Sequence, residues 1–155
     1  MIKFKLKAKF TNADIKKRAK EIIEANHRYI HTSLDAVGLQ FIIDARSKTP
    51  DQGGFNDDTG NLRSSIGYLI AFNGKVIGSK FDGQKSEGRT KGKEAAEKVT
   101  NEHPVGWAII FVAGMEYASY VEGYGYDVIT GSAIKISANV KDMLDRLASS
   151  VFEKI

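Results

Sequence analysis

The feature that constrains the fold most is a run of apolar side chains at helical spacing from about residue 13 to residue 47. Most successive members are separated by three, four or seven positions, which is the period of one face of an α-helix. The run stops at Thr49-Pro50, because the residue before a proline disfavours the helical conformation. Its apolar members are Ile15, Ala19, Ile22, Ile23, Ile30, Leu34, Val37, Phe41 and Ala45. The sequence therefore predicts one long helix over 13–47.

The start of this helix and one position inside it carry further signals. Thr11 or Asn12 can cap the helix, and Asp14 places a negative charge in its first turn, where the helix dipole favours one. Gly38 weakens a helix by up to about 1 kcal/mol relative to alanine. We expect a kink at this glycine, or close packing against a neighbouring element.

The first ten residues alternate between apolar and cationic side chains with a period of two. This period is typical of a half-buried strand, with one face toward a core and the other toward solvent. The apolar members are Ile2, Phe4, Leu6, Ala8 and Phe10, and the cationic members are Lys3, Lys5, Lys7 and Lys9. The sequence predicts an N-terminal strand over 1–10.

A hairpin is predicted over 66–81. Two apolar segments, 66–72 and 75–81, flank Asn73-Gly74, a dipeptide that tolerates the positive φ angles of a type I′ turn. Residues 105–113 are apolar enough for a central strand. A last run of apolar residues at mostly helical spacing predicts a C-terminal helix over 132–152.

Together these elements predict a single α+β domain over residues 1–155. We expect an antiparallel sheet of about four strands packed against the long N-terminal helix and the C-terminal helix. The segment 82–104 is polar, and its basic residues are nearly balanced by acidic ones. It is interpreted as a flexible insertion, in which a short helix over 94–101 is one option.

Charge and composition exclude several classes of protein. The net charge of +4 is concentrated at the start, where residues 1–48 hold 11 basic and 5 acidic side chains. This polarity suits an anionic partner or a complementary face of another subunit. Without cysteine there is no disulfide and no thiolate metal site. The longest apolar run, 107–113, is far shorter than the roughly 18 residues of a spanning helix, and the alternating N-terminus differs from a signal peptide. We expect a cytoplasmic origin and no membrane partner.

Asp58-Thr59-Gly60 lies in a loop over 50–60 that is rich in turn-forming residues. The same tripeptide occurs in aspartic proteases, where two such aspartates activate water, and only a homodimer could supply the second one here. The residues before it do not form the apolar strand that this chemistry needs. The favoured interpretation is that Asp58 or Thr59 caps a short helical turn through Leu62 and Ser65, with Gly60 permitting a tight entry.

Other patterns of catalytic or ligand-binding residues are weak. His27, His31 and Asp35 share one helix face at a spacing that can hold a metal ion, but a solvated helix face is the favoured interpretation. No Gly-x-Ser-x-Gly elbow and no phosphate-binding Gly-Lys-Ser/Thr sequence occurs. We expect no enzymatic activity, no cofactor and no bound metal.

The lysines at positions 3, 5, 7 and 9 would lie about 6.6 Å apart on one strand face, close to the phosphate spacing of a nucleic acid. No aromatic residue shares that face for base stacking, so such binding would not depend on base sequence. A solvated, edge-protecting face is the default interpretation. Lys3, Lys5, Lys7 and Lys9 stay candidates for a nucleic-acid face.

Four of the six tyrosines fall within ten residues, at Tyr117, Tyr120, Tyr124 and Tyr126. Tyrosine buries a large area and keeps one polar end, so such clusters are common at interfaces. A core corner closed by tyrosine hydroxyls is an equally good interpretation. With Glu122 among them, these residues are the candidate interface.

Two segments in order resemble a known family. The first is Thr49-Pro50 followed by Asp58-Thr59-Gly60-Asn61-Leu62-Arg63-Ser64-Ser65-Ile66, and the second is Tyr117-Ala118-Ser119-Tyr120-Val121-Glu122-Gly123. Together they resemble the tail-completion proteins of long-tailed double-stranded-DNA bacteriophages and prophages, which are also described as head-to-tail joining, neck or minor tail proteins. The resemblance covers roughly residues 12–155. It differs in the extended glycine-rich loop after Pro50, in the insertion 82–104, and in Gly123-Tyr124-Gly125.

The resemblance implies a structural virion protein without catalysis. Such a chain would form an oligomeric ring at the head-tail junction or tail end, assembled in the host cytoplasm and located in the virion. Its partners would be copies of itself and other phage neck, connector or tail-tube proteins, while DNA passes through the lumen without tight binding. We expect self-association through surfaces that include 117–126 and the 82–104 arm. The alternatives are a small, sequence-nonspecific nucleic-acid-binding module using the N-terminal lysines and, more distantly, a dimeric aspartic protease.

Overall fold

The computed structural model describes residues 9–152, and the predicted N-terminal strand therefore falls almost entirely outside the described residues. The chain divides within its first helix into two units, Met1–Thr32 and Ser33–Ile155. The sheet and the remaining helices all belong to the second unit.

The first helix, α1, runs from Asn12 to Ser47, as the apolar periodicity predicted. Its start is capped reciprocally: the Thr11 hydroxyl accepts a hydrogen bond from the Asp14 N–H at 3.2 Å, and the Asp14 carboxylate accepts one from the Thr11 N–H at 2.7 Å. Because the N–H groups of Thr11 and Asp14 both have hydrogen-bond acceptors, a helix start at this point is favoured. The helix ends before Pro50, which begins a short 3-10 turn, Pro50–Gln52.

The sheet of the second unit is antiparallel, with strand order β2-β1-β3. Its strands are β1 (Ile66–Phe72), β2 (Lys75–Lys80) and β3 (Trp107–Ala113). Asn73 and Gly74 have φ angles of 50° and 73°, so the predicted hairpin with its type I′ turn is confirmed. The described residues contain three strands, where about four were expected.

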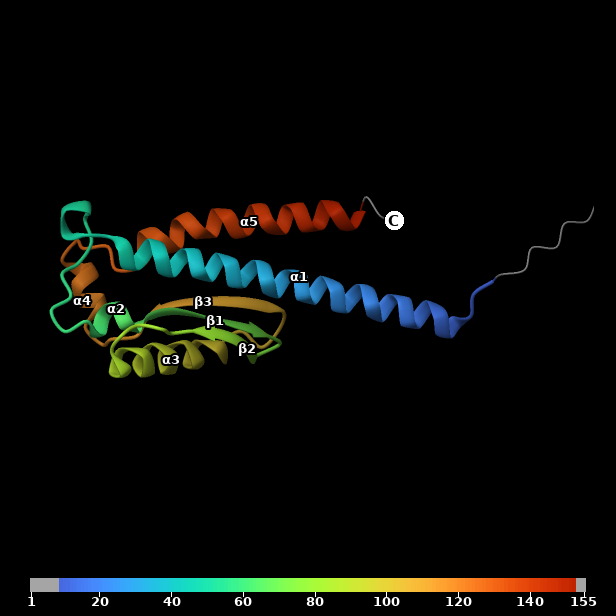
Figure 1. Cartoon of the computed structure of the whole chain (residues 1–155), viewed down its shortest axis with the longest axis horizontal. Coiled ribbons are helices and arrows are strands. Elements are labelled where there is room, and N and C mark those ends of the chain that lie inside the picture. The colour runs from blue at the N-terminus through green and yellow to red at the C-terminus, as the bar shows by residue number, and fades with distance from the viewer. Residues whose placement is uncertain (1–8, 153–155) are drawn as a thin grey trace, which may run out of the picture. The chain divides into compact units, whose positions relative to one another are not determined.

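Both faces of β1 are covered, and six of its seven residues are buried. Its alternating side chains serve two layers, which Figure 1 shows on opposite sides of the sheet. On one side, Tyr68 lies against Gly38 of α1, and Phe41 of α1 stacks on Phe111 of β3 at 4.3 Å between ring centroids. On the other side, Leu69 packs in a cluster with residues of α3 (Ser86–Thr100).

The helix α3, Ser86–Thr100, corrects the expectation of a flexible insertion over 82–104 with at most a short helix over 94–101. Its buried face consists of small residues four positions apart, namely Gly88, Gly92, Ala96 and Thr100. A β-carbon added at Gly92 would collide with the carbonyl oxygen of Ser65. Small side chains therefore let this helix approach the neighbouring backbone closely, and a search for large apolar residues misses its buried face.

Three further helices complete the second unit: α2 (Asn61–Ser65), α4 (Ala118–Gly123) and α5 (Thr130–Phe152). The helix α5 confirms the predicted C-terminal helix and lies beside the second part of α1, where Lys135 pairs with Asp44 at 2.9 Å. Among the described residues, no helix combines the length and the apolar composition needed to cross a membrane.

Candidate functional site

The first motif forms a structural joint around Arg63. The Arg63 guanidinium donates hydrogen bonds to the carbonyl oxygens of Arg46, Lys48 (3.2 Å) and Phe55 (3.0 Å). Its charged group also lies 4.8 Å from the centroid of the buried Phe55 ring. A single side chain from α2 thus satisfies backbone oxygens at the end of α1 and in the loop that follows.

Asp57, and not Asp58, holds the start of α2. The Asp57 carboxylate accepts hydrogen bonds from the N–H groups of Gly60 at 3.0 Å and Arg63 at 2.8 Å. Gly60 has a φ of 76°, a conformation in which glycine is least strained. Asp58 is exposed and accepts a hydrogen bond from the Asn56 amide at 2.9 Å. The prediction that Asp58 caps this turn is therefore wrong. The path of the loop brings the carboxylate of Asp57, and not that of Asp58, to the backbone N–H groups at the start of the helix.

The other residues of this motif also serve the fold. Thr59 accepts a hydrogen bond from the Asn61 N–H at 3.2 Å, and Leu62 is fully buried. The Ser65 hydroxyl donates to the Leu62 carbonyl at 2.8 Å. The Ser64 hydroxyl donates to the Gly60 carbonyl at 2.6 Å and accepts from the Lys85 N–H at 3.0 Å. The motif links the end of α1, the start of β1 and the approach to α3.

A hollow of about 430 Å³ lies beside this joint. The charged side chains that line it, Arg46, Arg63 and Asp82, form hydrogen bonds within the protein. Arg46 donates to the Ile66 carbonyl at 2.7 Å and to the Asp82 carboxylate at 2.7 Å. Partial burial acts to raise the pKa of Asp82, but the hydrogen bond and charge of Arg46 outweigh it and lower that pKa below its ordinary value. The hollow is thus the surface of a structural ion pair.

The second motif holds the start of α5 through Glu122. Its carboxylate accepts hydrogen bonds from the N–H groups of Ile129 and Thr130, each at 3.0 Å, and from the Thr130 hydroxyl at 2.9 Å. Partial burial acts to raise the pKa of Glu122, but these hydrogen bonds outweigh it and hold the pKa below its ordinary value. Asp127 adds a hydrogen bond from the Gly131 N–H at 2.9 Å and an ion pair with Lys48. Glu122, predicted as part of an interface, is a capping residue in the structure.

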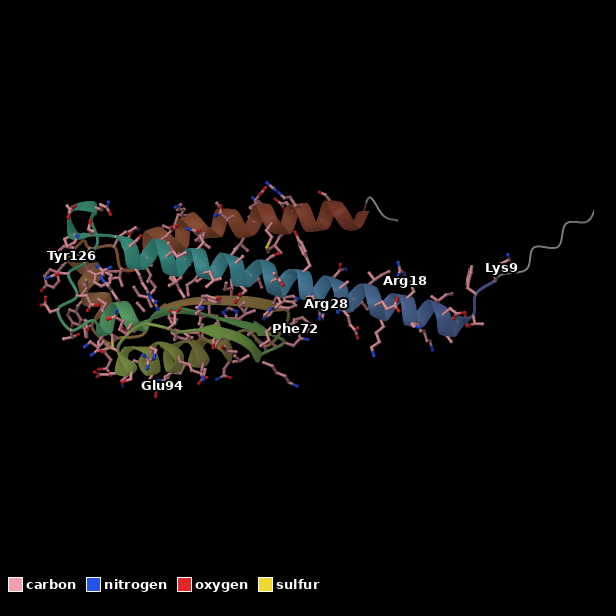
Figure 2. The ribbon with its side chains drawn as sticks, in the orientation of Figure 1. Lys9, Arg18, Arg28, Phe72, Glu94 and Tyr126 are labelled. Atoms are coloured by element: carbon pink, nitrogen blue, oxygen red, sulfur yellow. The ribbon has the colours of Figure 1, made fainter. Side chains whose placement is uncertain are left out.

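The four clustered tyrosines form an exposed surface, here called the tyrosine surface. Its members are Tyr117, Tyr120, Tyr124 and Tyr126, exposed by 40%, 72%, 81% and 46%. They lie on α4, just before it and in the loop that follows it, and Figure 2 labels Tyr126. A hollow of about 340 Å³ lies between Tyr120 and Tyr124, and Ser119 and Gly123 complete its lining. This exposure contradicts the core-corner interpretation and leaves the tyrosines available for an interface.

A second exposed apolar surface, here called the helical strip, lies in the first unit. It consists of Phe10, Ile15, Ile22, Ile23 and Tyr29, each between 49% and 63% exposed. Phe10, Ile15, Ala19 and Ile22 border a hollow of about 540 Å³. The sequence predicted the helix and did not indicate that this part of it would be exposed. The apolar residues have the same spacing in the buried and exposed parts, so the spacing alone does not distinguish the two parts.

The remaining predicted sites are not assembled in the structure. Asp35 accepts a hydrogen bond from the Tyr68 hydroxyl at 2.6 Å, which draws it toward the sheet. Across residues 9–152, no three histidine, aspartate or glutamate side chains are grouped closely enough to hold a metal ion. Of the candidate nucleic-acid face, Lys9 is exposed and is labelled in Figure 2, while Lys3, Lys5 and Lys7 lie outside the described residues.

Comparison with models of known protein families gives no match, and no similar chain is found among curated proteins or solved structures. The two sequence motifs and the two exposed surfaces are the features of the chain that bear on its function.

Proposed function

We propose that this chain is a structural subunit of an oligomeric ring at the head-tail junction or tail end of a long-tailed bacteriophage or prophage. The observation that carries the proposal is the presence of two separate exposed apolar surfaces, the helical strip and the tyrosine surface, on one small subunit. A closed ring needs two different, mutually complementary patches on every subunit, because each subunit meets its neighbours head to tail. The resemblance of the two motifs supplies the phage context.

In both motifs some side chains hold the backbone, and this supports a structural role. In the first motif, Asp57 and Arg63 hold backbone groups, and in the second, Glu122 holds the start of α5. The side chains of the second motif that face solvent include the tyrosines Tyr117 and Tyr120. Tyrosine is enriched in protein interfaces, because its ring buries a large area and its hydroxyl forms hydrogen bonds at the rim. A motif whose carboxylate holds the backbone and whose tyrosine rings face solvent suits contact with another protein.

Self-association tests the proposal. We expect the purified protein to form larger species as its concentration rises in sedimentation velocity, and ring-shaped particles in negative-stain electron microscopy. Replacing Tyr120 and Tyr124 by serine removes two exposed aromatic rings and should reduce association, while the unfolding free energy changes by no more than about 0.5 kcal/mol. A wild-type protein that stays monomeric at every concentration, alone or with neighbouring neck proteins, contradicts the proposal.

DNA binding tests the alternative of a nucleic-acid-binding module. A ring that conducts DNA should bind it weakly, because phosphates held by many subunits would retard passage. If Lys3, Lys5, Lys7 and Lys9 each neutralised one phosphate, the slope of log K against log salt would be near −3.6, at about −0.9 per contact. We expect little binding near physiological salt. Tight binding by the monomer, abolished when all four lysines are replaced by glutamine, would favour the alternative.

A further inference from the structure

The helical strip has a spacing that suits packing against another protein element. Ile15, Ala19, Ile22, Asn26 and Tyr29 follow one another at intervals of four and three residues. This alternation places them along one seam of a helix, which is the arrangement that fills holes on a facing surface, and a single asparagine in such a seam helps to specify the register of the contact. The exposed isoleucines lose contact with water when a partner covers them, and this burial of apolar area favours association.

The charges around the strip identify the kind of surface that covers it. Residues 9–32 carry six basic and three acidic side chains. Two of the basic residues form ion pairs along the helix, Arg18 with Glu21 at 3.3 Å and Lys20 with Glu24 at 3.8 Å. Within the described part of the chain, Lys16 and Arg28 have no such partner, so positive charge is left beside the apolar seam. An acidic partner surface is favoured.

Pairing of the strip with the same strip of another copy is disfavoured by these charges. Lys16 and Arg18 flank the seam at its start. Two parallel helices in register would bring these residues to the same end of the contact, where like charges repel. A partner surface that differs from the strip itself is therefore favoured.

The tyrosine surface has the complementary properties. Residues 114–130, which contain all four of its tyrosines, include three acidic side chains and no basic one. Asp127 pairs with Lys48 and Glu122 caps α5, so Glu116 is the acidic group that faces a partner. The Glu116 side chain is 91% exposed, and its ion pair with Lys91 is long at 3.9 Å. The hollow between Tyr120 and Tyr124 is otherwise lined by small residues, and it can receive a protruding isoleucine. Arginine also stacks favourably on exposed tyrosine rings.

We propose that the helical strip of one copy docks on the tyrosine surface of the next copy, so that repeated contacts of this kind join the subunits head to tail. This inference rests on the proposed ring and names the two patches that form its contact. The basic seam meets the acidic aromatic surface, and each subunit offers one patch to each of its neighbours.

Site-directed cross-linking tests this pairing directly, because the chain has no cysteine of its own. One protein carries Ile22→Cys and a second, distinguishable by an affinity tag, carries Tyr120→Cys. The two are mixed at a concentration at which the wild type associates, and a short bismaleimide is added. Mixing two single-cysteine proteins ensures that every mixed product joins different copies. Glu94→Cys, on the exposed face of α3 (Figure 2), replaces Tyr120→Cys as the matched control.

We expect the Ile22–Tyr120 product to exceed the Ile22–Glu94 product at least tenfold, and to decrease when Lys16 and Arg28 are replaced by glutamate. An associating protein that yields mainly Ile22–Ile22 products, or equal amounts with either partner cysteine, overturns the pairing and leaves the proposed ring intact. A protein that does not associate at all overturns the ring and the pairing together.

Discussion

Helix α1 is one element with two different surfaces. Its part after Ser33 supplies five buried residues, namely Leu34, Gly38, Phe41, Ile42 and Ala45. Its part up to Thr32 supplies no buried residue, although Ile15, Ile22 and Ile23 recur there at the same spacing. Helical periodicity therefore predicts that a face will be covered, without saying whether the cover comes from the same chain. In the second part the cover is the sheet, and for the first part we infer that it is another subunit.

The largest expected effect is the loss of Phe41. This side chain is fully buried and stacks on Phe111, so Phe41→Ala should lower the unfolding free energy by about 3–5 kcal/mol, because it leaves a cavity. The matched change in the first part, Ile22→Ala, should shift it by no more than about 0.5 kcal/mol. Urea unfolding followed by circular dichroism, at a protein concentration too low for association, measures both. Equal losses would show that the two parts of α1 do not differ.

Gly38 lies where the second part of α1 packs most closely on β1, and its replacement tests that packing. A β-carbon there would lie 2.6 Å from the Tyr68 ring. The gain in helix propensity from Gly38→Ala is about 1 kcal/mol, and we expect overpacking to exceed it, with a net loss of about 1–3 kcal/mol. Gly123→Ala is the control, because nothing lies within 4 Å of the added carbon. An unchanged or increased melting temperature for Gly38→Ala would contradict the close packing of α1 on β1.

Substitutions in the joint at the end of α1 should lower the unfolding free energy by a smaller amount. Asp57→Ala removes the acceptor for the Gly60 and Arg63 N–H groups and should cost about 1 kcal/mol. Asp58→Ala should cost less than about 0.5 kcal/mol, because the exposed Asp58 side chain accepts one bond from another exposed side chain. Chemical denaturation of both variants checks the assignment, and the reverse order of losses would contradict it. We also expect no proteolytic activity that depends on Asp58.

The cap made by Glu122 should appear in the pH dependence of stability. Because the pKa of Glu122 in the folded state is lower than its ordinary value of 4.5, its ionised form stabilises the fold above that value, and the contribution disappears as the pH falls through the folded pKa. Glu122→Gln should cost about 1 kcal/mol or less at pH 7, given its partial exposure. The difference between wild type and variant should shrink toward zero in strong acid, and a difference that does not change with pH would contradict the role of the carboxylate.

The parts of the fold that follow from local chemistry could be predicted from the sequence. The period of α1, the proline after it and Asn73-Gly74 at the hairpin each act within a few residues. The helix α3 was predicted only in part, as an optional short helix over 94–101, because its buried face is made of small residues such as Gly88, Gly92 and Ala96, which carry almost no hydrophobic signal. The one available clue was their regular spacing of four.

The sequence predicted which residues belong to the candidate site, but it did not predict how they are arranged. Four tyrosines in ten residues indicated an interface or a core corner with equal force, and only the folded chain shows them exposed. The choice between Asp57 and Asp58 depends on the path of a glycine-rich loop, which local propensities do not determine. The exposure of Ile15 and Ile22 depends on which part of α1 belongs to the second unit, and that is a property of the whole fold.

We infer that the first part of α1 is apolar because another copy covers it. The most direct test is sedimentation velocity over a range of concentrations, comparing the wild type with a variant in which Ile15 and Ile22 are both replaced by glutamine. We predict that the sedimentation coefficient of the wild type rises with concentration. The variant should stay at the monomer value with an unfolding free energy within about 0.5 kcal/mol of the wild type. A variant that associates as strongly as the wild type, or a wild type that never associates, would contradict the account.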